Sequence, residues 1–388
     1  MTDEGAGQGT GRVVRAADLG IRIGTGRPGP HNAITDVAGV RVGHTTLIAG
    51  DGPLVVGSGP VRTGVTVVVP GDDVGRAQYF AGCHRLNGNG ELTGLEWIRE
   101  SGLLTSPIAL TNTHSVGVVR DALVAAEVRS RPREEAFWSL PVVGETWDGM
   151  LNDVNGFHVR AEHLFAALDG ARPGPVAEGG VGGGTGMICH EFKGGIGTAS
   201  RVVADAAGGW TVGVLVQANY GERARLTVDG VPVGREIPTS EVPAPEAPPG
   251  EVTLPAGSGS IIAVVATDAP LLPHQCRRLA QRAGLGVARV GGVGAHSSGD
   301  LFVAFATGNA GDVYPGGPES AEGPLTRSVT MLADPWTSHL SEAVVDATEE
   351  AILNALVAGA TMAGRDGITA HALPHDRVRE VLAAYGRR

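Results

Sequence analysis

An apolar run, SIIAVVAT, begins at Ser260 directly behind a tract that is dense in proline and glutamate. The run is rich in β-branched residues and bounded by turn-forming residues, so it predicts a buried strand. The preceding tract, from Glu236 to Ala256, holds prolines too closely spaced for a helix or a strand ladder, and we expect it to be exposed and mobile. A buried strand is therefore expected to begin at a glycine-flanked serine, where a linker ends.

The rest of the chain predicts a mixture of strands and helices that come in blocks rather than in strict alternation. This grouping favours a layered α+β architecture over a doubly wound sheet. Strands are predicted at 34–44, 64–71, 141–149, 208–221, 285–292 and 300–307. Helices are predicted at 92–99, 116–130, 160–170, 273–284 (with Gly284 as a stop), 338–363 and 375–386, and residues 1–30 are predicted to form a loose arm.

Composition excludes several classes of protein. The net charge of −11 argues against nucleic acid or an anionic membrane as partner. Three widely spaced cysteines, Cys83, Cys189 and Cys276, form no metal-binding motif and fit a reducing compartment. The N-terminus has no apolar signal region, and no run approaches the ~18 apolar residues of a membrane span. We expect a cytoplasmic protein without a metal or organic cofactor.

Two motifs compete with Ser260 as the centre of the chemistry. The glycine-rich stretch Gly179–Gly186, with Lys193 behind it, is a weak candidate for a phosphate cradle and lacks the order of a nucleotide-binding loop. The sequence AHSSGD, residues 295–300, is a degenerate relative of a nucleophile elbow centred on Ser297. An elbow must lead from a strand into a helix, and the segment that follows here is plainly a strand.

Ser260 would gain a base if it became the first residue of a chain. A hydroxyl is a poor nucleophile without a neighbouring base, and an α-amino group with a pKa near 7.7–8 supplies one at neutral pH. This requires cleavage of the Gly259–Ser260 bond. Gly259 lacks a Cβ, so its carbonyl can be held open to attack by the Ser260 hydroxyl. From the residues alone, a serine that merely begins a strand remains the alternative.

Several motifs in order along the chain resemble those of the DmpA-type peptidases, the L-aminopeptidase/D-esterases and β-aminopeptidases. They are ITDVAGVRVGH, GNGELTG, VGGGTGMICHEFKGGIGTASR, VQANYG and GSIIAVVATDAPLLPHQ. The resemblance implies an Ntn-hydrolase-like αββα sandwich, similar also to the ornithine acetyltransferase fold. It implies a precursor that cleaves itself before a serine, into residues 1–259 and 260–388 of one catalytic domain, with a flexible linker at about 236–256.

The resemblance also implies roles for individual residues. Ser260 matches the nucleophile of both autoproteolysis and catalysis, and Asn219 matches the oxyanion-hole amide. Ser298 and Asp300 match a supporting serine and carboxylate, although the family often has glutamate at the second position. Two substrate-binding positions complete the set: Glu145 matches a carboxylate near the substrate amino group, and Trp147 stands where some members have an oxyanion-assisting tyrosine.

These features predict a self-processing serine aminopeptidase that acts on short peptides, amides or esters through an acyl-enzyme. Family members are typically homo-oligomers, tetramers of processed αβ units, and we expect the same here. Two alternatives stay open: an acyltransferase of the related processed fold, and a non-enzymatic module that binds a phosphorylated ligand at the glycine-rich loop. The preferred residue, its chirality and its α or β type do not follow from the sequence.

Overall fold

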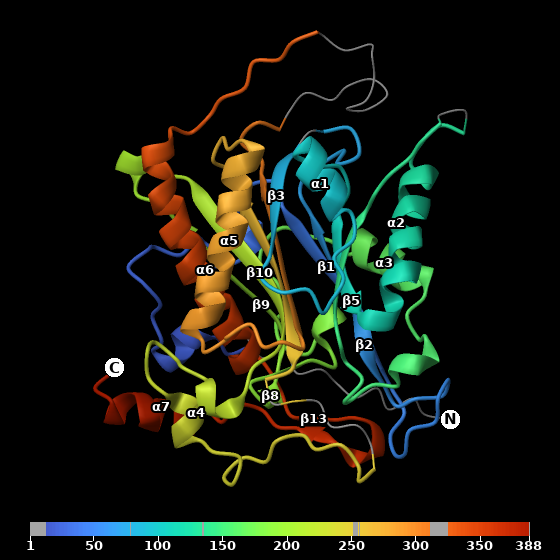
Figure 1. Cartoon of the computed structure of the whole chain (residues 1–388), viewed down its shortest axis with the longest axis vertical. Helices are drawn as coiled ribbons and strands as arrows, with labels where there is room; N and C mark the ends of the chain where they lie inside the picture. The colour runs from blue at the N-terminus through green and yellow to red at the C-terminus, as the bar shows by residue number, and fades with distance from the viewer. Residues whose placement is uncertain are drawn as a thin grey trace, which may run out of the picture.

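The protein consists of two stacked β-sheets with helices on both outer faces. A computed structural model describes residues 13–77, 79–133, 136–250, 255, 257–310 and 325–387 of the 388-residue chain. Helices α5 (Pro273–Arg289) and α6 (Thr337–Val357) cover one sheet, and α2 (Val116–Arg129) and α3 (Ala161–Asp169) cover the other (Figure 1). This four-layer αββα arrangement confirms the predicted fold class.

The larger sheet has six strands in the order β4-β3-β12-β11-β10-β9. All neighbours are antiparallel except β11 and β12, which are parallel. Strand β11 therefore lies in the interior of the sheet, with β10 on one side and β12 on the other. The strands are β3 (Tyr79–Arg85), β4 (Leu103–Leu104), β9 (Gly195–Val202), β10 (Thr211–Asn219), β11 (Gly259–Thr267) and β12 (Ser298–Ala306).

The smaller sheet has four strands in the order β1-β2-β5-β6, with only β5 and β6 parallel. They are β1 (Arg41–Ala49), β2 (Val61–Val69), β5 (Ile108–Asn112) and β6 (Val142–Thr146). The remaining elements are α1 (Leu95–Ser101), α4 (Val233–Glu236), α7 (His375–Ala384) and two small ribbons, β7 (Ile188–Cys189) with β8 (Phe192–Lys193) and β13 (Met362–Ala363) with β14 (Thr369–Ala370).

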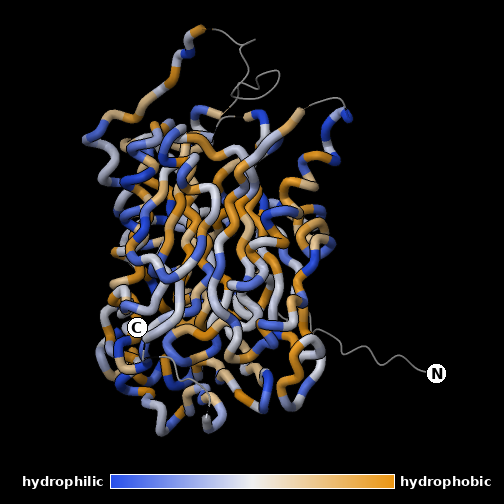
Figure 2. The backbone as a smooth tube through the Cα atoms, turned by 45° about the vertical axis from the view of Figure 1, so that its right-hand side comes forward, coloured by the Kyte–Doolittle hydropathy of each residue, from blue (hydrophilic) through white to orange (hydrophobic). Residues whose placement is uncertain are grey.

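Strand β11 is apolar from Ile261 to Ala266 because both of its faces are covered. Ile261 and Ala263 pack in the core beneath the helices α5 and α6, whereas Ile262 and Val264 pack in the core between the two sheets. Alternate residues of a strand point to opposite faces, so a strand buried on both sides needs a continuous apolar run. Figure 2 shows the resulting hydrophobic centre, with hydrophilic segments toward the outside.

The predicted bounds of several elements are wrong. The strand predicted at 34–44 begins only at Arg41 and continues to Ala49, and Ile34–Asp36 forms a 3-10 turn before it. Residues 285–292 were predicted as a strand, but α5 continues through Gly284 and Gly286 to Arg289. The close contact with α6 explains this, since a Cβ on Gly286 would lie 2.6 Å from Cβ of Thr348. Glycine thus serves helix packing here and not helix termination. The long helix near the C-terminus also ends earlier than predicted, at Val357.

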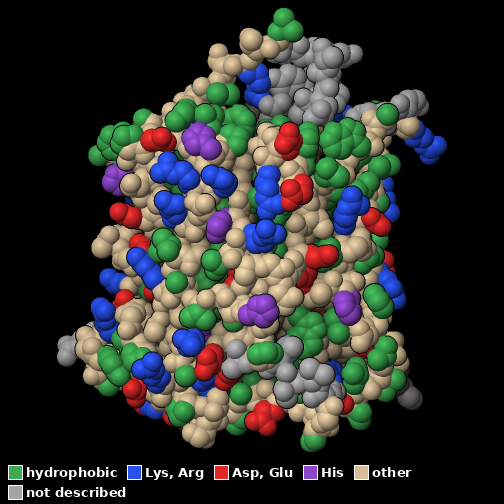
Figure 3. Space-filling model, viewed as in Figure 1, with side chains coloured by type: hydrophobic (Ala, Val, Ile, Leu, Met, Phe, Trp, Pro, Cys, Tyr) green, Lys and Arg blue, Asp and Glu red, His purple; other side chains and the backbone are tan. Residues whose placement is uncertain are grey.

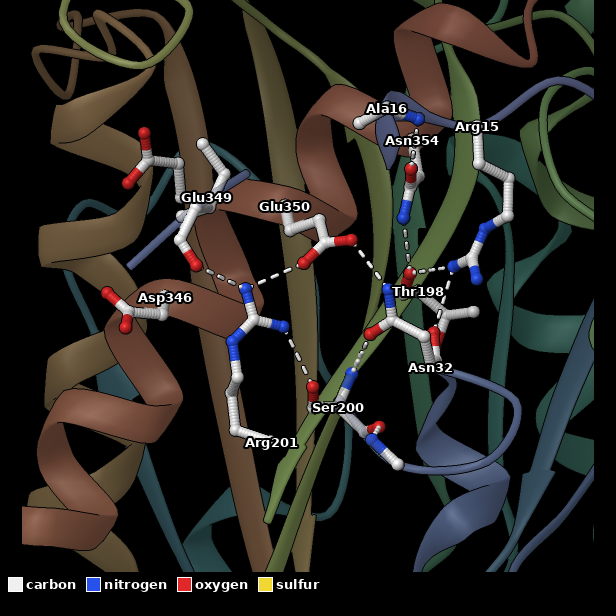
Figure 4. Close-up of polar contacts among 12 residues, drawn as sticks. Arg15, Ala16, Asn32, Thr198, Ser200, Arg201, Asp346, Glu349, Glu350 and Asn354 are labelled. Atoms are coloured by element: carbon white, nitrogen blue, oxygen red, sulfur yellow. Dashed lines mark hydrogen bonds and ion pairs between the residues drawn. The ribbon is translucent and has the colours of Figure 1, made fainter. Parts of the chain in front are cut away.

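The N-terminal segment is not a loose arm from residue 13 onward. Nε of Arg15 lies 2.7 Å from the carboxylate of Glu178, and the backbone N–H of Ala16 donates to Oδ1 of Asn354 at 2.9 Å. Asn32 donates to Glu350, which also pairs with Arg201 at 2.6 Å (Figure 4). A buried polar network therefore fixes the start of the chain on β9 and α6. Residues 1–12 lie outside the described residues.

The tract before β11 is largely exposed, as predicted, but its first part is held in place. Arg223 donates to the backbone carbonyls of Ile237 and Val242, and its guanidinium stacks 3.5 Å from the ring centroid of Phe192. Arg377 of α7 pairs with Glu241 at 2.6 Å. Residues 251–254 and 256 lie outside the described residues.

On the face shown in Figure 3, basic and acidic side chains are interspersed rather than segregated.

Candidate active site

Ser260 lies at the second position of β11, where strands from both sides meet it. It pairs with Asn219 at the end of β10 and with Gly299 near the start of β12. The backbone N–H of Gly299 donates to the Ser260 hydroxyl at 3.1 Å, and the serine is 5% exposed. By strand alternation, Ser260 shares the face of Ile262, which packs between the two sheets. Its hydroxyl therefore points toward the four-stranded sheet.

Gly259 adopts a backbone conformation that a residue with a side chain rarely adopts. Its φ is +134°, and a Cβ built there would lie 1.9 Å from the carbonyl oxygen of Asn219. Real Cβ atoms essentially never approach another atom that closely. The register between β10 and β11 thus requires glycine immediately before Ser260.

Two cavities meet at the Gly259–Ser260 junction. One, of about 530 Å³, is lined by Asn89, Gly90, Glu91, Thr113, Glu145, Trp147, Ser258, Gly259, Ser260 and Ser297. The other, of about 210 Å³, is lined by Trp147, Met150, Ile188, Glu191, Asn219, Gly221 and the linker residues Ala244, Pro245, Pro255 and Gly257–Gly259. The indole of Trp147 therefore stands at the boundary between them, consistent with a substrate-contacting position.

The side-chain amide of Asn219 is fixed at both ends. Its Oδ1 accepts from the backbone N–H of Ile188 at 2.8 Å, and its Nδ2 donates to the carbonyl of Trp147 at 2.9 Å. Because the first partner can only donate and the second can only accept, the orientation of the amide is unambiguous. One of the two Nδ2 hydrogens remains for a ligand beside Ser260.

Glu145 reaches the same cavity as Ser260 from the opposite sheet. It is 3% exposed, its Oε1 accepts from the backbone N–H of Glu91 at 2.9 Å, and its Oε2 accepts from the hydroxyl of Thr113. Burial raises the pKa of Glu145, and the two hydrogen bonds oppose this shift. A carboxylate in this position is suited to a cationic group in the cavity.

Ser298 and Asp300 lie on the other face of the sheet from the Ser260 hydroxyl. Ser298 donates to Oδ1 of Asp300 at 2.6 Å, and both share the face of Phe302, which packs beneath the helices. Burial raises the pKa of Asp300, while hydrogen bonds from Ser298, the Ile261 backbone and Asn87 oppose the shift. The pair thus reaches the backbone next to Ser260 rather than its hydroxyl.

Ser297 does not have the geometry of a nucleophile elbow. Strand β12 begins at Ser298, so no helix follows it. Its hydroxyl is 2.7 Å from that of Ser258, and His296 is exposed. Among the residues that the structure describes, no carboxylate or imidazole hydrogen-bonds to the Ser260 hydroxyl either. The described residues of the intact chain therefore offer Ser260 no side-chain base.

The glycine-rich loop is buried packing and not a phosphate cradle. Backbone N–H groups of Gly182 and Gly183 donate to the hydroxyls of Thr46 and Thr66 at 2.8 and 3.1 Å. A Cβ on Gly183 would lie 2.2 Å from Oε1 of Gln217, which leaves no room for a ligand. The packing therefore favours a tight turn between packed elements over the phosphate cradle, which was only the weaker alternative for this loop.

The loop Asn87–Gly90 overlaps the motif GNGELTG, for which no role was predicted. Asn89 donates to the carbonyl of Ser297 at 2.6 Å, and Asn87 accepts from the backbone N–H of Asp300 at 2.7 Å. The loop therefore positions the start of β12. The repeated Asn-Gly pair in NGNG is typical of a tight turn, but it does not indicate which residues the turn contacts.

No metal site is evident in the part of the chain that the structure describes, where no group of three or more His, Cys, Asp or Glu is placed to hold an ion. Within the same residues, no helix is long and apolar enough to cross a membrane. The three cysteines are free and buried, as expected for small apolar side chains.

A family model for peptidase family S58 matches residues 32–370. The chain belongs to peptidase family S58. The β-peptidyl aminopeptidase BapA of Sphingosinicella microcystinivorans is 49% identical over 391 residues, covering 98% of this chain and 95% of that protein. Family S58 membership and this relative make the chain a peptide hydrolase and an aminopeptidase, and they support neither the acyltransferase nor the binding-module alternative.

Two solved structures are similar over nearly the whole chain. A β-aminopeptidase from a Burkholderia species has a TM-score of 0.88 and 55% identity, and covers 97% of this chain and 100% of its own. The L-aminopeptidase D-Ala-esterase/amidase of Ochrobactrum anthropi has a TM-score of 0.85 and 43% identity, and covers 96% and 99%. The latter is described as a prototype serine aminopeptidase with a variant of the Ntn-hydrolase fold. This S58 member therefore has an Ntn-hydrolase fold.

Proposed function

We propose that this chain is a self-processing aminopeptidase whose nucleophile is Ser260 at the start of a newly formed chain. The single observation that supports this most is the cavity in which Ser260, Gly259 and Glu145 meet. A candidate nucleophile, the peptide bond before it and a buried carboxylate share one space there. Processing divides one domain into residues 1–259 and 260–388.

Processing begins with attack of the Ser260 hydroxyl on the carbonyl carbon of Gly259. The carbon–nitrogen bond between the two residues breaks, an ester forms in its place, and the hydroxyl proton passes to the departing nitrogen. Water then hydrolyses the ester, which leaves a free carboxylate on Gly259 and a free α-amino group on Ser260. The positive φ of Gly259, which a residue with a side chain rarely adopts, holds its carbonyl in the position from which this reaction starts.

Turnover reuses the same hydroxyl with the new amine as its base. The α-amino group takes the proton of the Ser260 hydroxyl as oxygen attacks the substrate carbonyl, and later returns it to the leaving amine. The free Nδ2 hydrogen of Asn219 stabilises the tetrahedral oxyanion. Ser298 and Asp300, on the other face, hold the Ser260 backbone and its amino group in place. Water releases the acyl group and regenerates the enzyme.

Glu145 selects substrates that carry a free amino group. Its buried carboxylate pairs with the terminal ammonium and places the following carbonyl at Ser260, while Trp147 lines the approach to both cavities. We propose peptides with an N-terminal β-amino acid as the preferred substrates, because two relatives at 49% and 55% identity carry that activity in their names. The processed protein is proposed to be a cytoplasmic homo-oligomer, a tetramer of processed units.

The test of the nucleophile compares Ser260→Ala with the matched variant Ser297→Ala, which changes the neighbouring serine of the same cavity. We expect Ser260→Ala to run as one band on a denaturing gel and to lack activity. We expect Ser297→Ala to be cleaved and active, with its smaller fragment beginning SIIAVVAT by N-terminal sequencing. Activity in Ser260→Ala, or an active wild type that is a single chain, would overturn the proposal.

The test of the substrate uses p-nitroanilides of β-alanine and L-alanine on the processed wild type. We expect a higher kcat/KM for the β-amino acid. The reverse order would overturn the proposed preference and leave the nucleophile untouched.

A further inference from the structure

Lys193 is the only lysine in a chain whose 30 basic residues are otherwise arginine. It lies in β8, is 0% exposed and donates to three backbone carbonyls. Its Nζ lies 2.7 Å from the oxygen of Gly194, 2.9 Å from that of Met187 and 3.3 Å from that of Gly184. All three acceptors are neutral peptide groups and none is a carboxylate. A cation buried in this way is costly to desolvate, so its position calls for an explanation.

The cage suits an ammonium and not a guanidinium. An ammonium is a compact charge with three donors, which matches three converging carbonyls, whereas a guanidinium is a larger planar fork. A Cβ built on Gly180 would lie 3.5 Å from Nζ, so the chain packs closely around it. Burial lowers the pKa of Lys193, to about 7, and Cys189 opposes this shift. Hydrogen bonds to three carbonyl acceptors also favour the charged form of an amine.

One of these carbonyls leads directly to the amide beside Ser260. Lys193 donates to the oxygen of Met187, and the N–H of the same peptide group, on Ile188, donates to Oδ1 of Asn219 at 2.8 Å. The Met187 oxygen also accepts from the backbone N–H of Gly194 at 2.9 Å. An unbroken chain of hydrogen bonds thus runs from the ammonium, through one peptide group, to the carboxamide of Asn219.

We propose that Lys193 is a positioning residue that orients and polarises Asn219 through the Met187–Ile188 peptide group. This inference rests on the proposed role of Asn219 in stabilising the oxyanion. A cation at the carbonyl end of a peptide group makes its N–H a stronger donor, and that donor in turn strengthens the next amide. The remaining Nδ2 hydrogen of Asn219 then meets the oxyanion as a stronger donor than an isolated carboxamide would.

The first test is a double-mutant cycle of Lys193→Met and Asn219→Ala on processed enzyme, with active sites titrated. Methionine fills a similar volume without charge or donors. We expect Lys193→Met alone to lower kcat roughly three- to tenfold with KM nearly unchanged, since polarisation is a fraction of one donor's contribution. In the Asn219→Ala background, we expect Lys193→Met to have no further effect on kcat.

Arg201→Met is the matched control, because Arg201 is also a fully buried cation but pairs with Glu350 in the N-terminal network. We expect it to lower thermal stability and to change kcat by the same factor in both Asn219 backgrounds. If Lys193→Met also lowers kcat equally in both backgrounds, its role is only structural and the inference is overturned.

A second test needs no variant, because a single lysine gives a single side-chain signal. Protein labelled with ¹⁵N at the lysine Nζ is titrated with an aminoalkyl boronic acid, whose adduct with Ser260 places a negative oxygen where the oxyanion forms. We expect the Lys193 signal to shift with the boronic acid but not with the matching amine that lacks boron.

This experiment distinguishes an error in the role inferred for Lys193 from an error in the proposed function. Inhibition by the boronic acid without a shift of the Lys193 signal would overturn the inference alone. Absence of inhibition of the processed wild type would overturn the proposed function, and the inference with it.

Discussion

Replacing Glu145 with glutamine tests whether this carboxylate makes the enzyme an exopeptidase. The change keeps the size of the side chain and removes its charge. Two donors face the carboxylate, the backbone N–H of Glu91 and the hydroxyl of Thr113. The backbone N–H requires an acceptor, which the amide oxygen of glutamine retains, while the Thr113 hydroxyl can rotate to accept from the new amide nitrogen. The variant is therefore expected to fold normally.

The size of the effect follows from the burial of Glu145. A hydrogen bond to a charged group contributes about 1.5–3 kcal/mol, and Glu145 is nearly inaccessible, so little of this is lost to solvent screening. Each 1.4 kcal/mol is a factor of ten, so kcat/KM for a free-amine substrate should fall about 10- to 150-fold. An N-acetylated substrate already lacks the cation, so its slower rate should hardly change.

The assay compares kcat/KM for free and N-acetylated p-nitroanilides in the wild type, Glu145→Gln and Glu91→Gln. Glu91 is the matched control, since it lines the same cavity but is exposed, and its removal should change the ratio by less than about threefold. Equal rates on free and acetylated substrates in the wild type would refute the reasoning. A loss in Glu91→Gln as large as in Glu145→Gln would show that general cavity charge, not a specific pair, selects the substrate.

Three further outcomes are expected. Asn219→Ala should fold and lose roughly 10²–10³ in kcat on peptide amides, and normal turnover would exclude its oxyanion role. Gly259→Ala should lower the free energy of unfolding by about 2–6 kcal/mol, because alanine disfavours the positive φ and its Cβ would collide with Asn219. It should also slow cleavage, as seen on a denaturing gel. Normal stability and cleavage would show that the junction needs no glycine. Burial raises the pKa of Glu145, and only its ionised form pairs with an ammonium. The affinity for an unreactive free-amine ligand, measured by calorimetry, should therefore be full above that raised pKa and fall as the pH drops through it. The affinity of Glu145→Gln should not change over the same pH range. A pH-independent affinity would contradict this.

The layered fold and the place of Ser260 could be predicted because they depend on local pattern. A continuous β-branched run must lie where both faces of a strand are covered, and β11 does so. The end of α5 could not be predicted in this way. Gly284 is a helix stop by its intrinsic preference, yet α5 continues past it, and the glycine that packs against α6 is Gly286, whose neighbour Thr348 lies far along the chain.

Candidate site residues could be chosen from the sequence, but their geometry could not be predicted from it. The motif HSSGD places Ser298 and Asp300 two residues apart, and strand alternation then puts both on one face. That this face is opposite the Ser260 hydroxyl depends on the register between β11 and β12, which no local pattern specifies. The role of Lys193 likewise depends on three carbonyls, those of Gly184, Met187 and Gly194, which the folded chain brings around its ammonium, and a lone lysine in a sequence does not indicate this.

The order of strands in the six-stranded sheet has a consequence for the protein after cleavage. The downstream fragment would contain only the two middle strands of this sheet, β12 and β11. The upstream fragment would contain the flanking pairs, β4 with β3 on one side and β10 with β9 on the other. Neither fragment could complete this six-stranded sheet alone, and each would expose unpaired edges prone to aggregation. Cleavage would therefore turn unfolding into dissociation. The melting temperature of the mature enzyme should rise with protein concentration, whereas that of an uncleaved chain should not.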